Sequence, residues 1–403
     1  MKPSYKSAKR GLQGVLRASV AALTIVFCFN TSKGQTRNVV KEGMAINVSV
    51  FNDNTGHWYG IKDAGNMINP LPGKPRYKAS EVRAIAENIL LFQKNNGGWP
   101  KNYDMLAVLT PAQKDTVLNG KGHTNTTFDN GTTYTQVEYL AKAYQELGDE
   151  RFKEGALKGF RFIVKAQYDN GGWPQYYPLE SNYSRHITYN DGAFEGIMRV
   201  LKNVTDRDPV YDFVRGNARK ELEVAYRKGM DCVLKTQIVE DGVPTAWCQQ
   251  HDEKSLAPAW ARKFEPPCIS NGESAGIVLF LMSIEHPSAE VIKAVENAVQ
   301  WFEKSKIYNT RVVRVDAPPM DTRYRHSVSD RVVKADSTAP PIWTRYYELK
   351  THRPMFCNRD SKVVYSLAEV ERERRDGYAW YVYAPQQVLD RYPDWKKHIA
   401  AAL

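Results

Sequence analysis

The 403-residue sequence has few of the residues and motifs that mark the common enzyme classes. It contains five cysteines and no Cys-x-x-Cys pair, and none of its eight histidines belongs to a His-Glu-x-x-His motif, so zinc is poorly supported. Gly-x-Gly-x-x-Gly and Walker motifs are absent, which removes most support for hydride and phosphoryl transfer. In contrast, 42% hydrophobic and 25% charged residues are typical of a large packed core.

Long apolar runs are also missing, because nothing after residue 34 approaches the 18 consecutive apolar residues of a membrane span. Residues 1–34 instead combine an N-terminal cluster of Lys and Arg with the shorter apolar run Ala18–Phe29 and the small residues of Ser32-Lys33-Gly34. This pattern predicts a signal peptide cleaved near Gly34 and a secreted or periplasmic protein. Cys28 follows Phe27 rather than a small residue, which argues against a lipoprotein anchor.

The net charge of +11 is concentrated in this N-terminal segment. Removing its six basic residues, with no acidic ones, leaves about +5, which is a mild bias and not the footprint of a nucleic-acid-binding protein. We expect the protein to be a monomer.

The remaining cysteines can form disulfides in an oxidising compartment or stay buried as free thiols, and the sequence leaves both open for Cys232, Cys248, Cys268 and Cys357.

Helical periodicity begins near Ser80. Residues 35–75 are rich in Gly, Asn and Pro turns, which predicts an irregular lead-in segment. Ser80 is a plausible N-cap, and apolar residues then recur at helical spacing as far as Asn95-Asn-Gly-Gly98. We expect residues 76–403 to form the functional domain.

The end of this helix recurs along the chain. The turn Asn96-Gly-Gly-Trp-Pro100 returns 74 residues later as Asn170-Gly-Gly-Trp-Pro174, and a degraded third copy follows Val233-Leu-Lys-Thr-Gln237 at Asp241-Gly-Val-Pro244. In the two Gly-Gly-Trp-Pro copies, Gly is expected to end the helix and Trp to fill the core. Returning helices are predicted between the copies, at Thr135–Leu147, Gly192–Lys202 and Glu273–Ile284. Stacked helix pairs of this kind predict a mainly α fold, an α/α toroid with loops on one rim forming a cleft.

The last hundred residues have a different composition. Residues 311–376 hold eleven arginines but three lysines, with two β-branched stretches, so we expect short strands and loops packed on the helices. Guanidinium forks match carboxylates in a bidentate manner, although ordinary surface ion pairing is the better explanation for any single arginine.

One motif matches a nucleophile elbow by its letters alone. Gly272-Glu-Ser-Ala-Gly276 fits Gly-x-Ser-x-Gly, but two prolines stand where a hydrophobic strand is required before it. We therefore interpret Ser274 as a structural residue in the first turns of a helix, with a serine esterase as the less favoured alternative.

Two carboxylates, Asp129 and Asp191, stand at loop-to-helix junctions. Each suits a helix cap. Two carboxylates on one rim can instead hold a hard cation such as Ca²⁺ and leave open positions for substrate oxygens. Their spacing alone leaves both interpretations open.

Eight ordered segments, from about residue 75 to the C-terminus, resemble signature segments of the family 10 pectate lyases. They are Asn96-Gly-Gly-Trp-Pro-Lys-Asn102, Phe128-Asp-Asn-Gly-Thr-Thr-Tyr-Thr-Gln136, Ile187-Thr-Tyr-Asn-Asp191, Trp247-Cys-Gln-Gln-His-Asp252, Ala261-Arg-Lys-Phe-Glu-Pro-Pro267, Trp343-Thr-Arg-Tyr-Tyr-Glu348, Arg353-Pro-Met-Phe-Cys-Asn-Arg-Asp360 and Glu373-Arg-Arg-Asp-Gly-Tyr378. The segment Gly192–Ile197 departs from the family pattern, chiefly at Phe194 and Glu195.

The resemblance implies a toroid-like fold that cleaves polygalacturonate by β-elimination with Ca²⁺. It implies calcium binding at Asp129 and Asp191 and a catalytic base at Arg262. It also implies substrate binding at Asn130, Arg345, Arg359 and Arg374, with Arg375 as an alternative to its neighbour. An arginine base must lose its proton first, so an alkaline rate optimum is expected.

Two other kinds of function stay open at this point. A helical-toroid glycoside hydrolase acting on uronate-containing glycans would use a pair of carboxyl groups and give saturated products. A non-catalytic glycan-binding protein would keep the Trp and Arg residues for binding alone.

Overall fold

The computed structural model describes residues 44–60, 65–71, 73–322 and 326–402. The expected signal peptide, residues 1–34, and its cleavage site near Gly34 lie outside these ranges. Residues 42–403 form one compact unit. Among the residues described, no helix combines the length and apolar character needed to cross a membrane.

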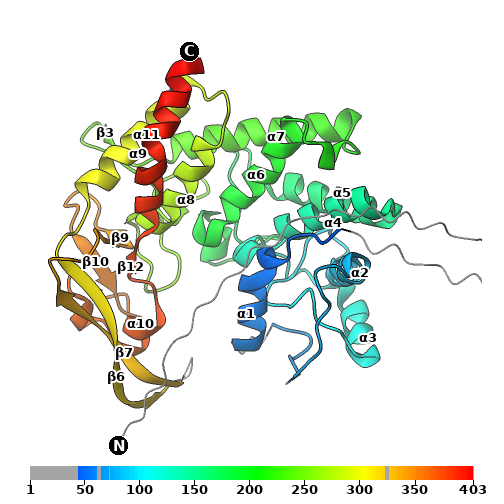
Figure 1. The fold of residues 1–403 in the computed structure, drawn as a ribbon, viewed down its shortest axis with the longest axis horizontal. Coiled ribbons are helices and arrows are strands. Elements are labelled where there is room, and N and C mark those ends of the chain that lie inside the picture. Colours follow the sequence, from blue (N-terminus) through cyan, green and yellow to red (C-terminus); the bar gives the residue numbers. More distant parts are fainter. Residues whose placement is uncertain (1–43, 61–64, 72, 323–325, 403) are drawn as a thin grey trace, which may run out of the picture. The chain divides into compact units, whose positions relative to one another are not determined.

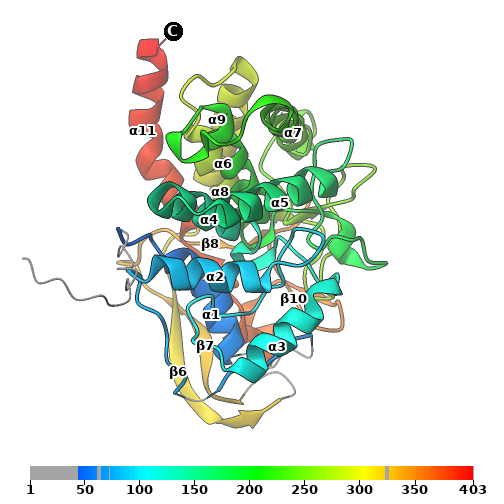
Figure 2. The same ribbon diagram turned by 90° about the vertical axis from the view of Figure 1, so that its right-hand side faces the viewer.

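Three helix pairs form the centre of this unit (Figure 1). They are α4 (Tyr134–Leu147) with α5 (Glu150–Ala166), α6 (Ala193–Thr205) with α7 (Gly216–Lys235), and α8 (Asn271–Met282) with α9 (Ala289–Lys304). The first members pack in the order α4, α6, α8, and the second members in the order α5, α7, α9. Figure 2 shows α4 and α5 side by side above α2. The mainly α, toroid-like helical repeat predicted from the sequence is therefore confirmed.

Further helices extend this array at both ends. At the N-terminal end, α2 (Val82–Phe92) packs on α4, and α3 (Pro111–Asn119) packs on α2. At the C-terminal end, α11 (Ala384–Ala402) packs on α8 and α9, while the short α10 (Arg372–Gly377) contacts the strand β7. The remaining helix, α1 (Asn52–Gly60), contacts the single turn at Asp129–Gly131 that precedes α4.

Local signals set the ends of the paired helices. Helix α4 ends at Gly148, which adopts a left-handed φ of 65° and donates its N–H to the Tyr144 carbonyl. Asp149 then caps α5 by accepting a hydrogen bond from the Arg151 N–H. The two helices are thus joined by two residues, which forces the chain to reverse.

The recurring Gly-Gly-Trp-Pro turns bind each helix pair to the next. Gly97 and Gly171 have φ values of 98° and 94°, and their α-carbons lie against the backbone of Lys158 in α5 and Lys228 in α7, where a side chain would clash. The indoles that follow are buried, and each donates to a carbonyl of the preceding helix: Trp99 to Ile89 (2.7 Å) and Trp173 to Ile163 (2.9 Å). Glycine thus ends the helix and tryptophan fills the core, as predicted.

The degraded third copy keeps the same contacts. The Trp247 indole donates to Val233 at 2.8 Å, although the turn at Asp241-Gly242 is followed by Val243-Pro244 in place of a second glycine. A glutamine also repeats: Gln93 and Gln167 each donate to the turn and to the next helix, and Gln237 donates to Thr245 and Ala294 in the same way. The third copy predicted from the sequence therefore repeats the tryptophan and glutamine contacts of the first two.

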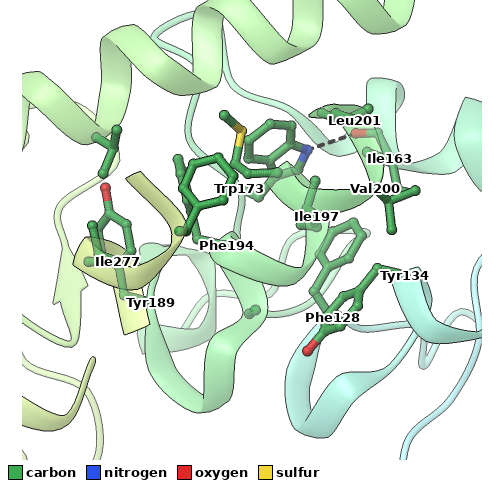
Figure 3. Packing of buried hydrophobic residues seen from close by; sticks show 14 of the residues in the cluster. Phe128, Tyr134, Ile163, Trp173, Tyr189, Phe194, Ile197, Val200, Leu201 and Ile277 are labelled. Atoms are coloured by element: carbon green, nitrogen blue, oxygen red, sulfur yellow. Dashed lines mark hydrogen bonds between the residues drawn. The ribbon is translucent and has the colours of Figure 1, made fainter. Parts of the chain in front are cut away.

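The core runs between the layers of helices. Figure 3 shows Trp173 packed among Phe194, Ile197 and Leu201. Phe194 meets Trp173 edge-on, with ring centroids 5.4 Å apart, and lies 4.8 Å from the Tyr189 ring. Phe194, where the sequence departs from the family pattern, is thus a core residue.

In the part of the chain that the structure describes, all strand pairs are antiparallel. One four-stranded sheet there has the order β11-β10-β9-β5, and four two-stranded sheets pair β1 with β4, β12 with β8, β2 with β3, and β6 with β7. The strand bounds are Ile187–Thr188 (β1), Val239–Glu240 (β2), Val243–Pro244 (β3), Gln250–His251 (β4), Ile269–Ser270 (β5), Thr310–Asp321 (β6), His326–Ala335 (β7), Trp343–Thr344 (β8), Tyr346–Tyr347 (β9), Pro354–Cys357 (β10), Val363–Val364 (β11) and Tyr381–Val382 (β12).

Two local predictions were wrong, and one helix was not predicted. The C-terminal strands are not all short, because β6 has 12 residues and β7 has 10. The lead-in also contains one helix that was not predicted, because residues 52–60 form α1, whose Trp58 is buried. Finally, Ser80 does not cap α2: Glu81 occupies the N-cap position, and its carboxylate accepts from the Lys78 N–H instead.

Candidate active site

Loops before α4 and α6 and segments of the C-terminal part surround a polar cavity of about 730 Å³. Six of the seven predicted site residues line it: Asp129, Asn130, Asp191, Arg262, Arg345 and Arg374. Arg359, the seventh, is not part of the lining. It pairs with Glu373, which also pairs with the lining residue Arg374. Residues more than 240 positions apart in the sequence therefore converge on one cavity.

Two equivalent single turns carry the acidic side of the cavity. Asp129–Gly131 precedes α4 and Asn190–Gly192 precedes α6, and the central residues Asn130 and Asp191 have left-handed φ values of 53° and 52°. Asn and Asp tolerate this conformation better than other side chains except glycine. Because both turns open onto helix N-termini, the helix dipoles favour negative charge there.

Lys101 balances the charge of Asp129. Its ammonium forms an ion pair with Asp129 Oδ2, and the Asp129 side chain is almost completely buried. Burial alone raises the pKa of Asp129, but the charge and hydrogen bond of Lys101 outweigh it, and the pKa lies below its ordinary value. Asp129 is therefore ionised at neutral pH.

The pKa of Asp191 shifts in the opposite direction to that of Asp129. Asp191 is exposed to the cavity, but the surrounding protein reduces its hydration, and this desolvation together with the charge of Asp129 raises its pKa to about 7. Two carboxylates so placed repel each other unless a cation lies between them.

Several oxygen atoms of this cavity lack hydrogen bonds. Among the described residues, no partner contacts Asp129 Oδ1, and the same is true of three amide oxygens, those of Gln175, Asn190 and Gln250. Buried polar atoms without partners are uncommon and indicate a missing ion or water. Carboxylate and amide oxygens are the ligands that Ca²⁺ prefers, so the donor set fits this ion.

Arg262 lies on the basic side and is held by Glu265. Its Nε donates to Oε2 at 2.8 Å and its Nη2 to Oε1 at 2.6 Å, while the Glu265 carboxylate is buried. Partial desolvation opposes the charge of Arg262, whose side chain is 46% exposed, but the ion pair outweighs it and raises the pKa of the guanidinium. The Tyr378 hydroxyl donates to Glu265 Oε1 at 2.7 Å and fixes the carboxylate in turn.

Arg345 projects from the connection between β8 and β9. Its Nη2 forms an ion pair with Glu273, and its guanidinium carbon lies 4.7 Å from the centre of the Tyr378 ring. The buried Nε has no hydrogen-bond partner among the described residues. This N–H is a donor available to a ligand.

Arg359 and Arg374 share one carboxylate. Arg359 Nε donates to Glu373 Oε2 at 2.7 Å, and Arg374 donates to both oxygens of Glu373 at 3.1 Å. Burial and the charges of Arg359 and Arg262 lower the pKa of Arg374. Glu373 thus holds both guanidinium groups and positions Arg374 at the cavity.

Arg375 points elsewhere. It pairs with Asp330 of β7 (Nε to Oδ1, 2.7 Å) and donates to the Val370 carbonyl at 2.7 Å. The structure thus places Arg374, and not Arg375, at the cavity.

Ser274 is buried in the first turns of α8. Its Oγ accepts from the Trp247 N–H at 2.9 Å and donates to the Trp247 carbonyl at 3.1 Å, so both ends of the hydroxyl are occupied. This agrees with the structural interpretation. The cysteines are also buried and free: Cys232, Cys248, Cys268 and Cys357.

Sequence reasoning missed the partners that hold the site. Lys101 and Glu265 stand inside segments identified as family signatures, but nothing local indicates that they pair with Asp129 and Arg262. Helix α1 was missed altogether, and its Asn54 donates to the Asn130 carbonyl at 2.6 Å. Asp53 accepts from the Asn130 amide at 2.7 Å. Both contacts join the lead-in to a predicted substrate-binding residue.

Glu195 is the second departure from the family pattern. It is buried in α6, Oε2 has no partner among the described residues, and burial raises its pKa to about 8. At neutral pH the side chain is therefore mostly protonated.

Comparisons with known proteins agree with this geometry. The family model described as pectic acid lyase matches residues 93–389. A mutant of the family 10 polysaccharide lyase from Cellvibrio cellulosa, in complex with trigalacturonic acid, is 30% identical, with a TM-score of 0.66 over 78% of this chain and 96% of that chain. Another structure of the family 10 polysaccharide lyase from the same organism is 29% identical, with a TM-score of 0.65 over 82% of this chain and 99% of that chain.

The search of curated proteins gave no significant match. The family match nevertheless spans most of the chain, and both solved structures are covered almost completely. The chain belongs to the pectic acid lyase family and is a polysaccharide lyase.

Proposed function

We propose that this protein is a secreted or periplasmic pectate lyase that cleaves polygalacturonate by calcium-assisted β-elimination. One observation carries the proposal: two facing carboxylates and a group of arginines line the same cavity. The carboxylates suit a cation, and the arginines suit the carboxylates of a polyuronate. A complex of a related lyase with trigalacturonic acid supports the same class of substrate.

Asp129 and Asp191 would hold the calcium ion, with the unpaired amide oxygens of Gln175, Asn190 and Gln250 as nearby donors. Bound there, calcium would supply Lewis-acid stabilisation of the substrate carboxylate. Lys101 keeps Asp129 ionised, and thus ready to bind a cation.

Arginines would position the uronate chain. Arg345 offers its unpaired Nε–H, and Arg374, which shares Glu373 with Arg359, lines the cavity. Asn130, fixed by Asp53 and Asn54, is a further substrate-binding candidate. These groups fix the sugar before its C5 proton is removed, which lowers the entropic part of the barrier.

Arg262 is our candidate base. In the reaction its deprotonated form would take the proton from C5, a C4–C5 double bond would form, and the C4–oxygen bond would break with its electron pair leaving on oxygen. The ion pair with Glu265 orients Arg262 but also raises its pKa, so only a small fraction is deprotonated near neutral pH. The rate should therefore increase with pH.

Arg374 is the second candidate base, because it lines the cavity and its pKa is lowered. Lysine substitutions separate the two. If Arg262 is the base, Arg262→Lys loses at least ~100-fold in kcat with a small change in KM, while Arg374→Lys mainly raises KM. The control Arg311→Lys alters only an exposed pair with Asp336. A kcat loss confined to Arg374→Lys would assign the base to Arg374.

The products separate this proposal from its alternatives. A hydrolase of uronate glycans gives saturated ends and a binding protein gives no turnover, whereas elimination gives an unsaturated product. Export is tested by the N-terminal sequence of the protein recovered outside the cytoplasm, which should begin near Gly34.

A further inference from the structure

A second cavity, of about 380 Å³, lies at the base of the β6–β7 hairpin and carries no predicted role. Its wall combines positive charge with aromatic and aliphatic side chains. The lining residues are Val312, Val313, Arg314, Arg331, Ile342, Leu367, Arg375, Tyr378, Trp380, Tyr381 and Tyr383.

Two arginines face each other in this wall. Arg314 of β6 and Arg331 of β7 are direct partners in the strand register, so their side chains leave the hairpin on the same face. Like charges directly opposite on two strands are unfavourable. An anion bound between them would turn this repulsion into attraction.

Nearby groups only partly compensate the two charges. Arg331 donates to the Tyr378 carbonyl at 3.2 Å, and Arg314 Nη2 lies 3.4 Å from Asp376 Oδ1, a long contact for an arginine that is 59% exposed. The third arginine, Arg375, is neutralised by Asp330. Among the described residues that line the cavity, none is acidic.

The rest of the wall suits a sugar ring. Tyr383 is 47% exposed and Tyr381 is half-buried, while Trp380 is buried and supports the wall from behind. Aromatic rings provide apolar contact area for the C–H face of a sugar, while guanidinium groups bind its carboxylate. The positive charge of the arginines and the aromatic side chains together favour a carboxylated sugar over a small inorganic anion as the ligand.

We propose that this cavity is an accessory site for one uronate unit of an acidic pectic chain. The inference rests on the proposed function for its ligand class. Tyr378 belongs to the lining of both cavities, so the accessory site lies next to the catalytic one. Such a site would retain long chains near the catalytic cavity.

Calorimetric titration with polygalacturonate in the presence of a chelator tests this site, since turnover is then suppressed. We expect wild-type protein to bind the polymer and the double variant Arg314→Gln/Arg331→Gln to bind about tenfold more weakly, the scale of a lost charge-assisted hydrogen bond. Arg311→Gln is the matched control, because it removes a charge from the same strand at a residue outside the cavity lining. Fully methyl-esterified polymer should bind poorly.

Three outcomes overturn the proposal: unchanged binding by the double variant, equal binding of the esterified polymer, or an equal loss of binding in Arg311→Gln, which would attribute the effect to net charge alone. Melting temperatures of the variants exclude unfolding as the cause. If no unsaturated product forms with calcium, the proposed function is refuted. The binding experiment does not depend on turnover, so its result is interpreted separately.

Discussion

Glu265 holds Arg262 through two parallel hydrogen bonds of 2.8 and 2.6 Å, and also accepts the Arg262 backbone N–H at 3.0 Å. The carboxylate is buried, so its charge acts on the guanidinium with little screening by water. The pair both orients the candidate base and stabilises its protonated form.

This relationship predicts a change in the pH profile. Glu265→Gln keeps the volume but removes the negative charge that raises the pKa of Arg262. A base acts when deprotonated, so lowering its pKa moves the rising limb of kcat against pH toward lower pH. The profile is measured for wild type and Glu265→Gln in the same buffers. If the rising limb of kcat lies at the same pH in wild type and Glu265→Gln, Arg262 is not the titrating base.

The carboxylate pair predicts a linked loss of metal binding and turnover. Asp129→Asn and Asp191→Asn each remove one charge at nearly constant volume, so calcium affinity should fall at least about tenfold, and turnover should fall with it. Calcium titration monitored by calorimetry measures the affinity. Asp231→Asn, on an exposed position of α7, is the control. If both site variants keep full activity and the full calcium response, Asp129 and Asp191 act only as helix caps.

Ser274→Ala should cost stability but not chemistry. The change leaves the buried Trp247 N–H without its partner, a loss of about 1–3 kcal/mol in unfolding free energy. Most of the turnover should remain, and small acyl esters should not be cleaved. Loss of all activity in a folded variant would support the esterase alternative.

The neighbours Arg374 and Arg375 should behave differently. Arg375→Ala removes the ion pair with Asp330 and a bond to Val370, so unfolding free energy should fall by about 1–3 kcal/mol with little change in KM. Arg374→Ala should raise KM for polygalacturonate, because its guanidinium lines the catalytic cavity. Equal KM values for both variants would contradict this assignment.

Much of the helical repeat was predictable because its signals are local. The helix predicted at Thr135–Leu147 differs by one residue from α4, and the Gly-Gly-Trp-Pro turns fix both the end of a helix and a core indole. These features depend on short stretches of chain, so they can be identified without knowing the fold.

Elements stabilised by distant contacts were harder to predict. The Asn-rich sequence of α1 resembles a turn, and the helix depends on contacts such as Asn54 with Asn130. Similarly, Arg311-Val-Val-Arg314 indicates one strand but not its 10-residue partner β7. The carboxylates of the site could be proposed from their junctions, whereas Lys101 and Glu265 acquire their partners only when the chain folds.

The most direct test of the account is the ultraviolet absorbance of the products from polygalacturonate, measured with calcium and with chelator, in parallel with reducing ends. We expect unsaturated, absorbing oligosaccharides with calcium and their loss with chelator. Highly methyl-esterified pectin should react more slowly, because esterification removes the carboxylates that calcium and arginine bind. Reducing ends without absorbance, unaffected by chelator, would contradict calcium-assisted elimination.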